Sequence, residues 1–107
     1  MDLPETDVPQ AQLLFAAGTT LFVDIRDADD FRAKRIPGAF HVDDSNVKQF
    51  VTDADKAATV VVYCYKGVSS LGATAFFLDQ GFTAVSSLKG GFSAWKKAGG
   101  AAERGTG

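Results

Sequence analysis

The chain has 107 residues and a net charge of −2, with 46% hydrophobic and 22% charged residues. This length predicts a single domain whose core is large enough to fold without disulfides. The acidic balance excludes the basic surface typical of nucleic-acid binding. One cysteine and one histidine exclude an internal disulfide and a cysteine-rich metal site, so we expect neither a metal nor another cofactor.

Short apolar runs alternate along the chain with helical patterns, and Gly, Asp or Pro marks the boundaries. In chain order we expect a helix over 8–18, a strand over 21–25, a helix over 27–35, a turn at 36–39, a strand over 39–42 and a helix over 43–55. Then follow a strand over 59–63, a helix over 69–80, a strand over 83–88 and a helix over 90–98. Residues 100–107 have nothing to bury, so we expect an ordered domain over about 5–99 and a flexible tail.

The strongest strand pattern, TVVVY at Thr59–Tyr63, is apolar without alternation, as is typical of a central parallel strand covered on both faces. The alternation of strands and helices predicts an α/β fold: a central parallel sheet of about five strands with helices on both faces. Ligands bind such sheets beyond the carboxyl ends of the strands. This rule points to the loop that follows Tyr63.

The location of the protein is predicted from what the sequence lacks. No apolar stretch reaches the roughly 18 residues that a membrane span requires. Residues 1–10 lack the basic start and the apolar run of a signal peptide. A single cysteine also suits a reducing compartment. We therefore expect a cytoplasmic protein that binds neither membranes nor nucleic acid.

The loop after Tyr63 leads into the predicted helix and reads Cys64-Tyr65-Lys66-Gly67-Val68-Ser69-Ser70. A cysteine here meets the positive end of the helix dipole and several unpaired amides, which favour the thiolate. Gly67 lets these amides converge into an anion-binding nest, and Lys66 adds a positive charge. Ser69 and Ser70 are expected to cap the helix and to donate their hydroxyls to a bound group. Taken alone, this loop is as consistent with an inert core cysteine as with a nucleophile.

Three segments in the expected order resemble the signatures of the rhodanese family, and the resemblance covers residues 8–98. The first comprises Val23-Asp24-Ile25-Arg26, Asp30-Phe31 and Arg35-Ile36-Pro37-Gly38-Ala39-Phe40-His41. The second is the Cys64 loop. The third is Leu88-Lys89-Gly90-Gly91-Phe92-Ser93-Ala94-Trp95, which is similar to a Gly-Gly-x-x-x-Trp signature. The loop and the small size are most similar to the stand-alone thiosulfate sulfurtransferases.

The resemblance implies an enzyme, a thiosulfate sulfurtransferase. The Cys64 thiolate would attack the sulfane sulfur of thiosulfate, release sulfite and carry the sulfur as a persulfide to cyanide or to a small or protein thiol. Cys64 would be catalytic, and the substrate would bind to Tyr65, Lys66, Gly67, Val68, Ser69 and Ser70. Two departures stand out: the loop lacks the arginine that many rhodaneses use to hold the sulfonate end of thiosulfate, and Arg35 replaces the usual histidine of the first signature.

Other chemically active residues are interpreted as structural. Asp24 and Arg26 are expected to hold a loop through a salt bridge rather than to react. His41, on a different strand from Cys64, is interpreted as a hydrogen-bonded structural residue. Aromatic side chains at helical spacing are expected in the core, namely Phe76, Phe77, Phe92 and Trp95. Gly90-Gly91 is interpreted as a tight turn.

Three competing functions remain at this stage. A cysteine phosphatase or an arsenate reductase would need an arginine six residues after the cysteine, where this chain has Ser70. Such an enzyme would also need a loop one residue longer than the loop of this chain. A persulfide carrier that docks to protein partners would use the same chemistry, and an exposed apolar patch including Tyr65 and Val68 would favour it. An inactive binding module is disfavoured because the cysteine and its glycine-containing loop are intact.

Overall fold

Five strands form one parallel sheet in the order β1-β5-β4-β2-β3 in the computed structural model, which describes residues 2–104. The strands are β1 (Glu5–Thr6), β2 (Leu21–Asp24), β3 (Phe40–His41), β4 (Thr59–Tyr63) and β5 (Ala84–Leu88). The helices are α1 (Val8–Ala17), α2 (Ala28–Ala33), α3 (Val47–Asp53), α4 (Ser69–Asp79) and α5 (Gly91–Lys97). The predicted α/β class with about five parallel strands is confirmed.

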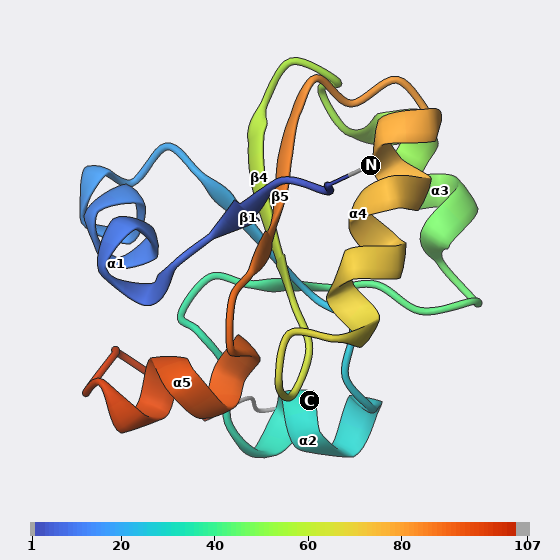
Figure 1. The fold of residues 1–107 in the computed structure, drawn as a ribbon. Helices are drawn as coiled ribbons and strands as arrows, with labels where there is room; N and C mark the ends of the chain where they lie inside the picture. Colours follow the sequence, from blue (N-terminus) through green and yellow to red (C-terminus); the bar gives the residue numbers. More distant parts are fainter. Residues whose placement is uncertain (1, 105–107) are drawn as a thin grey trace.

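Helices cover both faces of the sheet, with α1 and α5 on one side and α3 and α4 on the other (Figure 1). The side chains of β4 explain this arrangement, because alternate residues of a strand point to opposite faces. Val61 and Tyr63 belong to the apolar cluster that includes Trp95 of α5, whereas Val60 and Val62 belong to the cluster on the α3 and α4 side. None of the described helices is both long and apolar enough to cross a membrane.

The expected elements differ from the observed ones where backbone contacts decide the structure. The strand β1 was not predicted, because its two residues, Glu5 and Thr6, have no apolar pattern and are held by parallel pairing with β5. The helix expected over 43–55 begins only at Val47. Before it, the Asp43 carboxylate accepts a hydrogen bond from the Ser45 amide, which stabilises a turn instead of a helix.

One of the expected core aromatics lies at the surface. Trp95 is fully buried, and Phe77 and Phe92 are nearly so. Phe76 remains 42% exposed, which corrects its assignment to the core. The reason is its position on α4, because Phe77 faces the sheet and its neighbour is therefore turned toward the outer surface.

The segment after α5 makes contacts that were not expected of a flexible tail. The indole nitrogen of Trp95 donates a hydrogen bond to the carbonyl of Ala101 at 2.7 Å. Glu103 pairs with Arg35 through both backbones and through a 3.0 Å ion pair, and its carboxylate also accepts from the Gly38 amide. Residues 100–104 therefore lie against the domain, and residues 105–107 of the expected tail lie outside the described residues.

The burial of Trp95 leads to a prediction about stability. Its ring packs against Phe15 and Phe22, with centroid distances of 5.8 and 5.9 Å. Trp95→Ala is expected to lower the free energy of unfolding by about 3–5 kcal/mol, because it leaves a cavity and removes a buried contact surface. Urea denaturation measures this change. Leu13→Ala is the matched control, because Leu13 is 67% exposed and its truncation is expected to cost no more than about 0.5 kcal/mol.

Candidate active site

Cys64 lies at the carboxyl end of β4, where the backbone curls around its sulfur. The Gly67 amide donates a hydrogen bond to Sγ at 3.2 Å, and the Ser70 amide donates one at 3.3 Å. The Ser70 hydroxyl oxygen lies 3.2 Å from the same sulfur. These donors come from the loop and from the first turn of α4, whose amides have no partner within the helix. The amide hydrogens thus converge on a sulfur atom that is almost fully enclosed, since Cys64 is only 3% exposed.

The environment of Cys64 changes its acidity. Burial raises the pKa of the thiol, because an enclosed thiolate loses hydration. The hydrogen bonds from the Ser70 hydroxyl and from the amides of Ser70, Gly67 and Lys66 lower this pKa, because they stabilise the negative sulfur. The donors outweigh burial, and the pKa of Cys64 lies below the ordinary value for cysteine. A thiolate is the nucleophilic form of the residue.

The curl of the loop depends on a glycine that lies against the turn between β5 and α5. Gly67 has φ of +88°, a conformation that residues with a side chain rarely adopt. A Cβ atom at this position would lie 2.8 Å from the Gly90 nitrogen and 3.1 Å from the Leu88 carbonyl oxygen. Only glycine therefore allows the loop to pass this close to the neighbouring turn.

The start of α5 supports the Cys64 loop from behind. The Phe92 amide donates to the Cys64 carbonyl at 2.9 Å, and the Ser93 amide donates to the Tyr65 carbonyl at 3.0 Å. A Cβ atom on Gly91 would lie 2.6 Å from the carbonyl carbon and oxygen of Tyr65. The two glycines in sequence were interpreted only as a tight turn. Gly91 has the further role of letting the first amides of α5 reach the backbone of the Cys64 loop.

The two serines of the loop have different environments. The N-cap of α4 is Val68, and no side chain caps this helix, so the expectation that Ser69 and Ser70 would cap it is wrong. The Ser70 side chain is instead buried and lies between Cys64 Sγ and the hydroxyl of Ser87, with an Oγ to Oγ distance of 2.7 Å. Ser69 is exposed and therefore remains accessible to a bound group, as is Lys66.

Asp24 and Arg26 form a buried ion pair near the site. The Arg26 guanidinium lies 2.7 Å from the Asp24 carboxylate and also donates to the Lys34 carbonyl at 2.6 Å. Its Cζ atom lies 4.2 Å from the centre of the Phe92 ring. Arg26 therefore connects the end of β2, the segment after α2 and the start of α5. This geometry agrees with the structural role expected for the pair.

His41 has other partners than Cys64 among residues 2–104. Its Nε2 atom lies 2.7 Å from the Arg26 carbonyl, and its ring packs against Phe31. Tyr65 extends away from the sulfur toward α2, where its hydroxyl donates to the Asp30 carboxylate and accepts from the Asp27 amide. The tyrosine is 44% exposed, so it presents an aromatic surface beside the loop.

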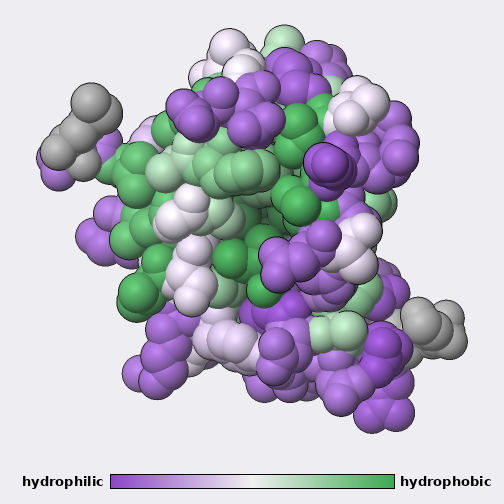
Figure 2. Space-filling view, turned by 90° about the vertical axis from the view of Figure 1, so that its right-hand side faces the viewer, coloured by the Kyte–Doolittle hydropathy of each residue, from purple (hydrophilic) through white to green (hydrophobic). Residues whose placement is uncertain are grey.

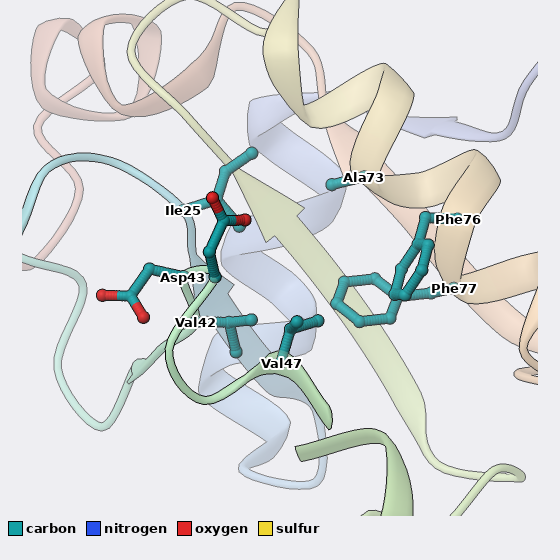
Figure 3. A pocket seen from close by; sticks show the side chains of 8 residues that line it. Ile25, Val42, Asp43, Val47, Ala73, Phe76 and Phe77 are labelled. Atoms are coloured by element: carbon teal, nitrogen blue, oxygen red, sulfur yellow. The ribbon is translucent and has the colours of Figure 1, made fainter. Parts of the chain in front are cut away.

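A hollow of about 420 Å³ lies near the loop on the face covered by α3 and α4 (Figure 3). It is lined by Ile25, Val42, Asp43, Asp44, Val47, Ala73, Phe76 and Phe77. Ile25 connects the hollow to the site, because its amide donates to the carbonyl of Tyr63, the residue before Cys64. Figure 2 shows that apolar side chains gather on this face of the molecule. Within residues 2–104, no cluster of three or more His, Cys, Asp or Glu side chains could hold a metal ion.

Comparison with known proteins places these features in a family context. The protein-family model of the rhodanese-like domain matches residues 7–98 of this chain. The solution structure of a rhodanese-like domain from Anabaena sp. is 27% identical, covers 97% of this chain and 80% of its own, and superposes with a TM-score of 0.85.

Two further solved structures cover nearly the whole chain. A protein from Rhodopseudomonas palustris, described as being of unknown function and a possible tyrosine phosphatase, is 28% identical, with a TM-score of 0.81 over 94% of this chain and 85% of its own. A protein from Bacillus halodurans is 25% identical, with a TM-score of 0.81 over 94% of this chain and 77% of its own.

The lowered pKa of Cys64 predicts its reactivity with an alkylating agent. Because the thiolate persists to lower pH than in an ordinary cysteine, the rate of reaction with iodoacetamide is expected to fall at lower pH than it does in the urea-unfolded chain. Cys64 is the only cysteine, so mass spectrometry assigns the product without ambiguity. A midpoint at or above that of the unfolded chain would contradict the prediction.

The contact between Gly91 and the loop predicts the effect of a single methyl group. Gly91→Ala and Gly99→Ala each place alanine at positive φ, which costs about 1–2 kcal/mol. Only the Gly91 Cβ meets a neighbour, because nothing lies within 4 Å at Gly99. Gly91→Ala is expected to cost about 1–3 kcal/mol more and to slow alkylation of Cys64, whereas Gly99→Ala leaves that rate unchanged. Equal effects of the two variants in urea denaturation and alkylation would exclude the proposed contact.

Proposed function

Since the chain belongs to the rhodanese-like domain family, we propose that it transfers sulfane sulfur through a persulfide on Cys64. The observation that carries this proposal is the convergence of the Gly67 and Ser70 amides, together with the Ser70 hydroxyl, on the Cys64 sulfur. The donor is thiosulfate or a similar compound, and the acceptor is cyanide or a thiol. The rhodanese family supports sulfur transfer or a related activity, and the specific donor and acceptor are part of our proposal.

The proposed reaction has two displacement steps. The Cys64 thiolate attacks the outer sulfur of thiosulfate and forms a new S–S bond. The S–S bond of thiosulfate breaks, and sulfite leaves with its electron pair. The acceptor then attacks the outer sulfur of the persulfide, and the Cys64 thiolate leaves, so the protein returns to its starting state. The hydrogen-bond donors that already face the Cys64 sulfur stabilise negative charge on sulfur in both steps, and they do not have to move.

The exposed residues of the loop are proposed to bind the donor and the acceptor. Lys66 supplies the positive charge that a sulfonate requires, and Ser69 supplies a hydroxyl at the start of α4. Val68 and Tyr65, 75% and 44% exposed, form the apolar part of the loop surface. Because lysine is a flexible point charge and arginine a planar fork, this loop holds a sulfonate less rigidly than one that contains arginine.

The same surface favours a second candidate function, a persulfide carrier that docks to a protein partner. Large apolar side chains are rarely left exposed together without a reason. Val68 and Tyr65 are exposed on the Cys64 loop, and Phe76 is exposed on α4, the helix that follows this loop. A protein that receives sulfur from one partner and passes it to another would use this surface for both contacts.

Phosphatase activity is less well supported. The phosphate-binding loop of cysteine phosphatases depends on an arginine that clamps the phosphoryl oxygens. In this chain the corresponding residue is Ser70, whose buried hydroxyl contacts Cys64 and Ser87. No positive charge can be provided from that position.

Incubation with thiosulfate tests the proposed function directly. The intact mass is expected to rise by one sulfur atom, and the increase should disappear on treatment with cyanide, which forms thiocyanate. Cys64→Ala is expected to show no increase, because it lacks the nucleophile. An unchanged mass of the parent protein under excess thiosulfate would rule out thiosulfate as the donor, and phosphate release from an aryl phosphate would favour the phosphatase.

Turnover distinguishes the enzyme from the carrier. An enzyme in thiosulfate and cyanide is expected to release many molecules of thiocyanate per chain, at a rate proportional to protein concentration. A carrier is expected to accept sulfur slowly from thiosulfate but to load rapidly from a persulfidated protein. Thiocyanate formation limited to about one molecule per chain would therefore favour the carrier.

A further inference from the structure

A buried hydroxyl on β5 lies behind the reactive loop. Ser87 is fully buried, and its Oγ atom lies 2.7 Å from the Oγ atom of Ser70. The Ser70 hydroxyl in turn lies 3.2 Å from Cys64 Sγ. The three side chains thus form a continuous hydrogen-bonded row that begins at the sulfur and ends inside the protein. Among the described residues, the Ser87 hydroxyl has no other side-chain partner, so Ser70 is its only hydrogen-bonding contact.

We propose that Ser87 is a positioning residue that turns the Ser70 hydroxyl toward the Cys64 sulfur and thereby favours the thiolate. The proposal rests on the proposed function, because it assigns a residue that prepares the nucleophile for sulfur transfer. It does not require thiosulfate to be the donor. Ser87 does not touch the sulfur itself and acts only through Ser70.

The number of available hydrogens explains the direction of the effect. When Cys64 is a thiol, its hydrogen points to the Ser70 oxygen, the Ser70 hydrogen points to the Ser87 oxygen, and the Ser87 hydrogen has no acceptor in the row. When Cys64 loses its proton to solvent, the row reverses. The Ser87 hydrogen then points to Ser70, and the Ser70 hydrogen points to the negative sulfur. In the thiolate state every hydroxyl hydrogen has an acceptor, and the bond from Ser70 is strong because the sulfur is charged, whereas a neutral thiol is only a weak acceptor.

The surroundings of Ser87 strengthen this effect. The row is enclosed, because Ser70 and Ser87 are both fully buried and Cys64 is nearly so. Water therefore does not compete for the hydroxyl hydrogens, and each hydrogen bond acts in a medium of low polarity. The Ser87 backbone is also fixed, since its amide donates to the Pro4 carbonyl as part of the pairing between β1 and β5. The hydroxyl is thus held in a constant position relative to Ser70.

The neighbouring residue of β5 provides a matched control. The Ser86 hydroxyl forms a similar pair, with the Thr6 Oγ1 atom at 2.6 Å. Because adjacent residues of a strand point to opposite faces, this pair lies away from Cys64. Ser86→Ala therefore removes a hydroxyl from the same strand without changing the row that ends at the sulfur.

The experiment measures the pH dependence of Cys64 alkylation by iodoacetamide in four variants. Ser87→Ala is expected to shift the midpoint to higher pH and to slow the reaction about threefold to tenfold at pH values below the midpoint, as expected for the loss of one hydrogen bond. Ser86→Ala is expected to react like the parent protein. Ser70→Ala is expected to shift the midpoint upward, and Ser70→Ala with Ser87→Ala is expected to match Ser70→Ala alone.

Two results would overturn the proposal: an unchanged midpoint in Ser87→Ala, or a further shift when Ser87→Ala is added to Ser70→Ala. If the alanine variant does not fold, Ser87→Thr and Ser87→Val replace it, because these side chains have the same shape and only threonine keeps the hydroxyl. A threonine variant that reacts like the valine variant would also overturn the proposal. The absence of a persulfide in the parent protein, together with the expected midpoint shifts, would refute only the proposed function.

Discussion

Hydrogen bonds from α5 to the backbone of the reactive loop are the constraint on which the site depends. The Phe92 and Ser93 amides hold the carbonyls of Cys64 and Tyr65, and further along the same loop the Gly67 and Ser70 amides are directed at the Cys64 sulfur. The start of the loop is thus held by α5, and the amides that follow it converge on the sulfur. A preorganised set of donors stabilises charge without having to move during the reaction, which is the main source of electrostatic catalysis.

The three sequence signatures meet around this constraint. The first provides Arg26, which is paired with Asp24 and packs against the Phe92 ring. The third provides Gly91, which allows α5 to approach the loop, as well as Trp95, which anchors that helix in the core. Segments far apart in the chain therefore serve one purpose, since each holds the backbone on which the nucleophile lies. Their spacing follows from the sheet, whose strands end at the same edge (Figure 1).

Much of the fold could be predicted from local patterns, and so could the position of Cys64. The apolar run of β4 and the glycine-containing loop before a helical pattern carry that information within a few residues. Contacts between distant residues could not be predicted in the same way. The pairing of β1, the attachment of Glu103 to Arg35 and the contact of Ser70 with Ser87 involve residues without apolar periodicity. They depend on which strands become neighbours, and that is decided by the whole fold.

The close approach of Gly67 to the turn at Gly90 shows that the main-chain path of the loop and its outward-facing side chains have different roles. Main-chain atoms meet there directly, so this contact of the loop does not depend on which side chains face outward. Tyr65, Lys66 and Val68 are exposed at the same loop and contribute no part of that contact. Under the proposed function, exchange of these three side chains would therefore change how the donor fits while the main-chain contact at Gly67 stays the same.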